Sequence, residues 1–177
     1  MEIAYSKEFR PEGQGLFYVS KTDFGRSRKF TTVFDCGSNN VTKLKKEIDH
    51  VLGSDNHINL LVLSHLHYDH ISGLDYLLNE KHTQIDELVL PYLLPEERMV
   101  LQMANTEYAG WYSDLLRNPL AYLSGYTNIN HISVIAGDNP EEPLPGYNFG
   151  TPDDEKPNQD DDQNWAPEMR VQVNLEE

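Results

Sequence analysis

The stretch LLVLSHLHYDHISGLDYLL at residues 60–78 places three histidines and an aspartate directly after an apolar run. The chain has only seven histidines, so this grouping needs a reason. A continuous apolar segment is typical of a strand that is buried on both faces. We predict such a strand over residues 58–65, whose carboxyl end presents His65, His67, Asp69 and His70. Asp69 and His70 are expected in the turn that leads into the next helix.

Three segments before this motif are rich in aromatic and β-branched residues and are separated by Gly and Pro. They predict an antiparallel meander of strands at residues 2–9, 15–22 and 29–37. Apolar residues at helical spacing then predict a helix over residues 41–52. Asn39 or Asn40 can cap its start, and Gly53 can end it.

After the motif, apolar spacing predicts a helix up to Leu78 and then a strand at residues 86–93. A long helix is expected from Pro95 to about Asn118, with Pro95 in its first turn. A shorter helix follows to Ser124, and strands are expected at residues 131–137 and 169–175. This alternation predicts an α/β fold with a mixed sheet.

The last forty residues differ from the rest of the chain. Twelve of the 29 acidic residues lie at or after Asp138, in a segment rich in Pro, Asp and Asn. We divide the chain into a domain at 1–137, an acidic loop or linker at 138–168, and the start of a further strand at 169–177. A strand that begins so near the last residue suggests a piece of a longer protein.

Composition limits the classes of function. The formal net charge of −15 argues against nucleic-acid binding through a broad basic face. A nucleic-acid substrate is not excluded, because bound metal ions would bring their own charge. One cysteine, Cys36, rules out an internal disulfide. There is no signal-peptide pattern and no apolar run of membrane-spanning length, so we predict a cytoplasmic protein without membrane contact.

The donor atoms of the motif suit a transition metal. Imidazole and carboxylate groups favour zinc, iron or manganese over calcium and magnesium, which prefer oxygen donors. Neighbouring side chains cannot all reach one ion without strain. The simplest division gives His65 and His67 to one ion and Asp69 and His70 to a second.

The pattern His-x-His-x-Asp-His, between an apolar strand and a helix, resembles the signature of the metallo-β-lactamase superfamily. The segment Asp35-Cys36-Gly37 is similar to the Asp-x-Gly that family members carry after an early strand. The resemblance covers about residues 15–93. It implies an αββα sandwich and two divalent ions, zinc first, with iron or manganese as alternatives.

The resemblance also implies a reaction. A metal-bridged hydroxide would attack an ester or phosphoester, with His65 and His67 on one ion and Asp69 and His70 on the other. Asp69 and Asp35 would be the catalytic aspartates. Asp35 would also form hydrogen bonds that orient the segment carrying His65, His67, Asp69 and His70, here called the motif loop. Phosphodiesters and nucleotides are favoured as substrates by family analogy, beside thioesters, lactams and lactones.

The chain departs from the family pattern in its second half. The family has three more ligands, and only His82 and His131 follow His70. We interpret His82 as an exposed loop residue and His131 as a polar residue at the edge of a strand, with a ligand role as the alternative for His131. Asp138 faintly resembles the family's bridging aspartate, but Gly-Asp-Asn-Pro is also ordinary turn chemistry. The second half of the fold is therefore expected to be absent, through truncation or because another polypeptide or a second copy supplies it.

An alternative function is a catalytically incomplete metal-binding or partner-binding subunit with an acidic arm.

Other residues of the chain are weaker candidates for a functional role. Cys36 has no evident histidine partner, and Ser64 is not in a nucleophile elbow. The aromatic residues Tyr108, Trp111 and Tyr112 lie at near-helical spacing. Packing is the default interpretation for them, with substrate stacking as the alternative.

Overall fold

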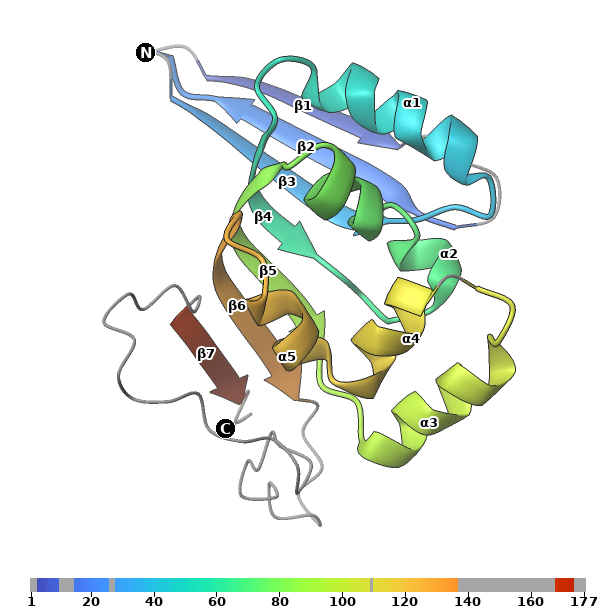
Figure 1. Ribbon diagram of the computed structural model, residues 1–177. Coiled ribbons are helices and arrows are strands. Elements are labelled where there is room, and N and C mark those ends of the chain that lie inside the picture. The colour runs from blue at the N-terminus through green and yellow to red at the C-terminus, as the bar shows by residue number, and fades with distance from the viewer. Residues whose placement is uncertain (1–2, 10–14, 26–27, 109, 137–167, 174–177) are drawn as a thin grey trace.

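One seven-stranded mixed sheet organises the protein, and its strand order follows the sequence from β1 to β7 (Figure 1). The computed structural model describes residues 3–9, 15–25, 28–108, 110–136 and 168–173. The first three strands form an antiparallel meander, and the later strands run parallel to β3 and to one another. The strands are β1 (Ala4–Phe9), β2 (Phe17–Asp23), β3 (Lys29–Cys36), β4 (His57–Val62), β5 (Gln84–Pro91), β6 (Ile129–Ala136) and β7 (Glu168–Val173).

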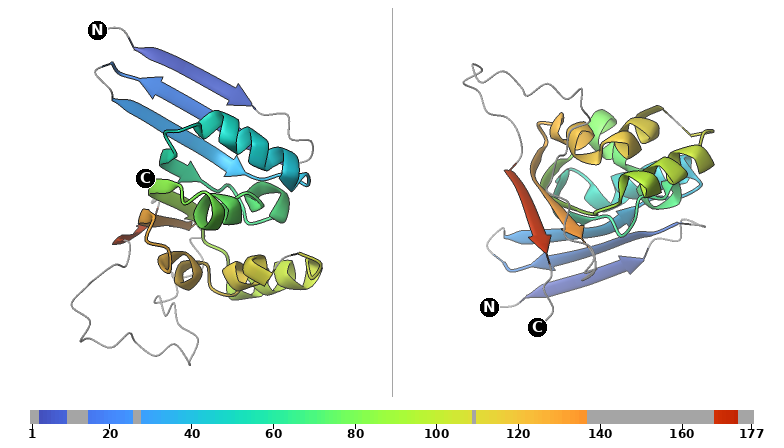
Figure 2. Two further views of the ribbon diagram at one scale, coloured as in Figure 1. Left: turned by 45° about the horizontal axis from the view of Figure 1, so that its top comes forward. Right: turned by 90° about the horizontal axis from the view of Figure 1, so that it is seen from below.

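The helices cover one face of this sheet (Figure 2). In chain order they are α1 (Val41–Leu52), α2 (Tyr68–Ile71), η1 (Tyr76–Glu80), α3 (Pro95–Ala104), α4 (Gly110–Arg117) and α5 (Pro119–Ser124). None of the described helices is both long enough and apolar enough to span a membrane. The expected mixed α/β architecture is confirmed.

Helix α1 follows directly from its sequence. The Asn40 side chain accepts a hydrogen bond from the Lys43 N–H at 3.0 Å, which caps the first turn. Gly53 ends the helix with φ of +54°, a conformation that glycine adopts readily. The apolar positions form one buried stripe against the sheet, and burying each such side chain contributes about 1.5–3 kcal/mol. The stripe consists of Leu44, Ile48, Val51 and Leu52.

Two predictions about helices are wrong. Helix α2 begins at Tyr68, so Asp69 and His70 lie in its first turn and not in a turn before it. The helix predicted from Pro95 to Asn118 is two helices. Helix α3 ends at Ala104, because Asn105 has φ of −131° and its side-chain amide donates to the Leu101 carbonyl at 2.7 Å.

No described helix covers the other face of the sheet, which carries a row of apolar side chains beside polar ones. The predicted burial of β4 on both faces is not observed, since Leu60 and Val62 remain half-buried. On this face the rings of Phe9 and Tyr18 lie 4.5 Å apart, and those of Tyr18 and Phe34 lie 5.6 Å apart. Phe9 is 74% exposed and Phe34 41%. The second sheet of an αββα sandwich is not among the described residues.

The end of the chain is described only in part. The predicted linker at residues 138–168 lies outside the described residues except for Glu168, where β7 begins. Strand β7 pairs in parallel with β6, from His131 with Glu168 to Ala136 with Val173. A strand is therefore present where the sequence predicts one.

Candidate metal centre

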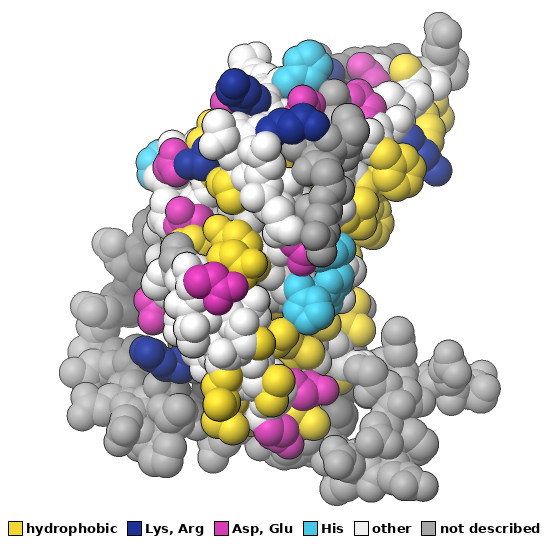
Figure 3. All heavy atoms as spheres, turned by 90° about the vertical axis from the view of Figure 1, so that its right-hand side faces the viewer, with side chains coloured by type: hydrophobic (Ala, Val, Ile, Leu, Met, Phe, Trp, Pro, Cys, Tyr) yellow, Lys and Arg dark blue, Asp and Glu magenta, His cyan; other side chains and the backbone are white. Residues whose placement is uncertain are grey.

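The motif lies at the carboxyl end of β4, where neighbouring parallel strands also end. Strand β4 stops at Val62, and a short loop leads to His67, which precedes the first turn of α2. This edge of an open α/β sheet is the usual position of a ligand site. Figure 3 shows a group of histidine side chains together on the surface of this side of the molecule, with hydrophobic side chains below them.

The structure brings the predicted ligands together. The rings of His65 and His67 are 4.8 Å apart, and those of His65 and His70 are 3.7 Å apart. The Asp69 Oδ2 atom lies 3.9 Å from His70 Nε2. The side chains of His70 and Asp69 are 20% and 23% exposed, so solvent and solutes can reach them.

Asp35 lies beneath this group and is fully buried. Its Oδ1 accepts the Ser64 N–H at 2.6 Å, and its Oδ2 accepts the Ser64 hydroxyl at 2.6 Å and His70 Nδ1–H at 2.7 Å. Its φ of +51° is uncommon for a residue with a side chain. These hydrogen bonds hold Asp35 in that conformation, and in return Asp35 fixes both ends of the motif loop.

The same hydrogen bonds determine the histidine tautomers. The Ser64 hydroxyl has one proton and donates it to Asp35, so it accepts from His65 Nδ1 at 2.8 Å. His70 also carries its proton on Nδ1, facing Asp35. The Nε2 atoms of His65 and His70 therefore present lone pairs, as the ring nitrogens of metal-binding histidines do. Sequence reasoning missed this role of Ser64, for which the only signal is its position directly before His65.

The surroundings of His65 favour a neutral ring. Burial lowers the pKa of His65, and the nearby His70 and His67 lower it further. A neutral imidazole is the form that binds a metal ion. A lowered pKa favours the form of His65 that coordination of a metal ion would require.

The donor set fits a divalent transition metal. Ligand atoms of Asp35, His65 and His70 lie within 4.8 Å of one another. His67 and Asp69 are outside that compact set, although their side chains adjoin it. Because the Asp35 oxygens already accept three hydrogen bonds, we expect the ion-facing atoms to come from the imidazoles and Asp69, with Asp35 behind them. The division between two ions stays a prediction.

Gly37 lets the end of β3 approach the motif closely. A Cβ atom at this position would lie 2.3 Å from the Asp69 carbonyl oxygen and 2.3 Å from the His70 carbonyl carbon. Next to it, the Ser38 N–H donates to the Ser72 hydroxyl at 2.9 Å, and that hydroxyl donates back to the Ser38 carbonyl at 2.8 Å. The Asp-x-Gly segment and α2 are therefore packed backbone against backbone.

Comparison with known proteins identifies the family. A family model described as the metallo-beta-lactamase superfamily matches residues 24–154. The chain belongs to the metallo-β-lactamase superfamily. Members of this superfamily are largely hydrolases and typically bind divalent metals.

A search of solved structures found a β-lactamase domain protein from Burkholderia ambifaria, with 16% sequence identity and a TM-score of 0.37 over 69% of this chain. The present chain spans 36% of the length of that protein. A search of curated proteins found no match.

The further superfamily ligands are not found near the motif among the described residues. His82 is exposed, with φ of +50°, in the turn before β5. His131 lies within β6, which begins at Ile129, two residues earlier than predicted. It pairs with Glu87, which is level with Leu60, two residues before the end of β4 and five before His65. Asp138 lies outside the described residues.

The aromatic residues of α4 pack beside the superfamily motif. Tyr112 is 1% exposed, and its hydroxyl donates to the Leu66 carbonyl at 2.9 Å. Burial raises the pKa of Tyr112 to about 12. Tyr68, inside the motif, stacks on Tyr108 with ring centroids 3.8 Å apart. The packing interpretation of Tyr108, Trp111 and Tyr112 agrees with this arrangement, but the sequence did not reveal the contact of Tyr112 with the motif.

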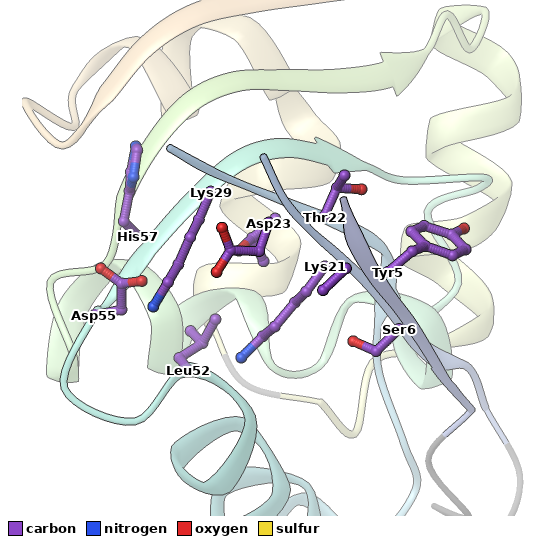
Figure 4. A pocket seen from close by; sticks show the side chains of 11 residues that line it. Tyr5, Ser6, Lys21, Thr22, Asp23, Lys29, Leu52, Asp55 and His57 are labelled. Carbon is purple, nitrogen blue, oxygen red and sulfur yellow. The ribbon is translucent and has the colours of Figure 1, made fainter. Parts of the chain in front are cut away.

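A cavity of about 260 Å³ opens at the other end of the sheet (Figure 4). Lys29 and His57, the first residues of β3 and β4, line it, so it is remote from the histidines at the far ends of these strands. Lys21, Asp23 and Asp55 also face it. Because both positively and negatively charged side chains line the cavity, it favours no particular class of ligand.

Proposed function

We propose that this chain is the metal-binding part of a metal-dependent hydrolase. The observation that carries the proposal is the pair of imidazoles, His65 and His70, whose Nδ1 protons are engaged by Ser64 and Asp35 while both Nε2 atoms stay available. Two divalent ions are proposed, zinc first and iron or manganese as alternatives. His65 and His67 would hold one ion, and Asp69 and His70 the other.

The residues of the chain have distinct roles in this proposal. Bound divalent ions supply a water nucleophile at neutral pH and polarise the substrate oxygen. The imidazoles hold their positions because Asp35 and Ser64 fix their tautomers. Asp69 is the partly exposed carboxylate of the group and the proposed proton acceptor. Asp35, fully buried, acts through His70 and Ser64.

The proposed substrate is an ester or phosphoester, with phosphodiesters and nucleotides favoured by analogy with the superfamily. The net charge of −15 disfavours a broad nucleic-acid surface, so contact would be confined to the metal centre. We propose a cytoplasmic location, which agrees with a single, buried cysteine, Cys36.

A second candidate is a catalytically incomplete subunit that gains its remaining ligands from a partner chain or a second copy. The open sheet face supports this candidate. Phe9, Phe34 and Ile135 are 74%, 41% and 40% exposed on it, and exposed apolar side chains gathered on one face often mark an interface. Neither His82 nor His131 joins the histidine group in the described part of the chain.

Metal content and hydrolysis, measured on the same preparation, test the proposal. The protein is purified without chelator or nickel resin, metals per chain are determined by elemental analysis, and chromogenic ester and phosphodiester substrates are then assayed with added Zn²⁺ or Mn²⁺. A ratio near two with hydrolysis supports the enzyme. Bound metal without hydrolysis favours the incomplete subunit. No bound metal, before or after reconstitution, contradicts both.

A further inference from the structure

Helix α4 supplies the motif loop with a support that is independent of Asp35. The Tyr112 hydroxyl donates to the Leu66 carbonyl at 2.9 Å across a separation of 46 residues. Leu66 stands between His65 and His67 in the sequence. The hydrogen bond therefore fixes the peptide group between Leu66 and His67, one of the two that join the histidines.

Both partners of this hydrogen bond are rigidly placed. Tyr112 and Leu66 are each 1% exposed and belong to the hydrophobic core. The His70 N–H donates to the His67 carbonyl at 3.0 Å, so the first turn of α2 closes after Leu66. The Leu66 carbonyl thus accepts a hydrogen bond from outside the loop, from the Tyr112 side chain of α4.

The same helix also contacts the motif through its aromatic rings. The Tyr68 ring lies edge-on to Tyr112, with centroids 5.4 Å apart, and stacks on Tyr108 at 3.8 Å with nearly parallel planes. Tyr68 follows His67 directly. The loop is therefore held at Ser64 and His70 by Asp35, and at Leu66 and Tyr68 by α4 and the residues before it.

We propose that Tyr112 is a positioning residue of the metal centre, whose hydroxyl sets the mutual orientation of His65 and His67. This inference rests on the proposed metal-binding function. The ring of Tyr112 contributes to the core and its hydroxyl to the loop. A Tyr112→Phe substitution keeps the first contribution and removes the second.

A zinc titration of the apoprotein separates the two contributions. Outer hydrogen bonds that orient metal ligands change metal affinity by about 10–100-fold, so Y112F is expected to bind Zn²⁺ at least about tenfold more weakly than wild type. The matched control is Y122F, which removes the hydroxyl that accepts from Tyr126 at 2.8 Å in another part of the fold. The control should bind Zn²⁺ like wild type. Equal affinity in Y112F and Y122F, at similar unfolding midpoints, would overturn the inference.

A second readout needs no metal. In ¹⁵N-labelled apoprotein, Y112F is expected to shift the ring-nitrogen signals of His65 and His67 and to leave those of the distant His57 in place. Y122F should shift none of them. Unchanged signals for His65 and His67 in Y112F would refute the positioning role. If wild type binds no Zn²⁺, the proposed function fails, and the ring signals alone then decide on Tyr112.

Discussion

The carboxylate of Asp35 and the Nδ1 atom of His70 are 2.7 Å apart, although 35 residues separate them in the sequence. Asp35 is the penultimate residue of β3, and His70 lies in the first turn of α2. Their contact, together with the two hydrogen bonds from Ser64, joins the halves of the motif into one unit.

Replacing Asp35 with Ala should reduce activity more than metal content. The ligands remain, but His70 and Ser64 lose the acceptor that orients them. Losing the hydrogen bonds that the exposed Ser64 and the partly buried His70 donate should also cost about 0.5–1.5 kcal/mol of stability for each bond. Metals per chain, hydrolysis rates and urea unfolding measure the three effects. The exposed Asp55, replaced by Ala, is the control; metal lost in proportion to activity would make Asp35 a direct ligand.

Replacing His67 with Ala should lower the amount of bound metal, since one neutral imidazole donor is removed. The His67 ring lies at the surface 4.8 Å from the His65 ring, so little packing is lost with it. Elemental analysis of H67A and wild type, purified side by side, measures the change. H82A removes an exposed histidine outside the group and serves as the control. Unchanged metal in H67A would exclude His67 from the centre.

Replacing Gly37 with Ala should displace α2, the helix that carries Asp69 and His70. The added Cβ would come within 2.3 Å of backbone atoms of Asp69 and His70, and backbone cannot give way as a flexible side chain does. We expect G37A to lose metal binding and to unfold at a lower urea concentration than wild type. Gly110 has open space around it, so G110A is the matched control and should behave like wild type. Full metal binding by G37A would show that the close approach is not required.

Alkaline pH should destabilise the fold through Tyr112. Its pKa is raised to about 12 by burial, against about 10 for an unfolded tyrosine. Between these values the unfolded chain releases the proton and the folded chain keeps it, so the free energy of unfolding falls as pH rises from about 10 to about 12. Urea unfolding across this range should show a smaller fall in Y112F than in wild type. Equal slopes would mean that the hydroxyl titrates normally.

The sequence predicted the motif and most elements, because both depend on local patterns. Val41 to Leu52 forms the expected helix between Asn40 and Gly53, since its caps and apolar stripe lie within one segment. The roles of Ser64 and Tyr112 were missed because each depends on a partner that only the tertiary fold brings near. The division of the predicted long helix into α3 and α4 was missed because the apolar spacing continues to Trp111. The non-helical backbone conformation of Asn105, which ends α3, is not visible in that spacing.

Phe34 offers a test of the open sheet face. It lies between Tyr18 and Val62 in the cross-strand row and is 41% exposed. If a partner chain or second copy covers this face, F34K should abolish association, because a charge would be buried in an apolar interface. The isolated chain should keep nearly its full stability, since the side chain already meets solvent there. Sedimentation velocity measures association, and urea unfolding measures stability. Lys29→Glu, at the far end of the same strand, is the charge-changing control. A monomeric wild type, or an F34K variant that associates as wild type does, would assign another role to this face.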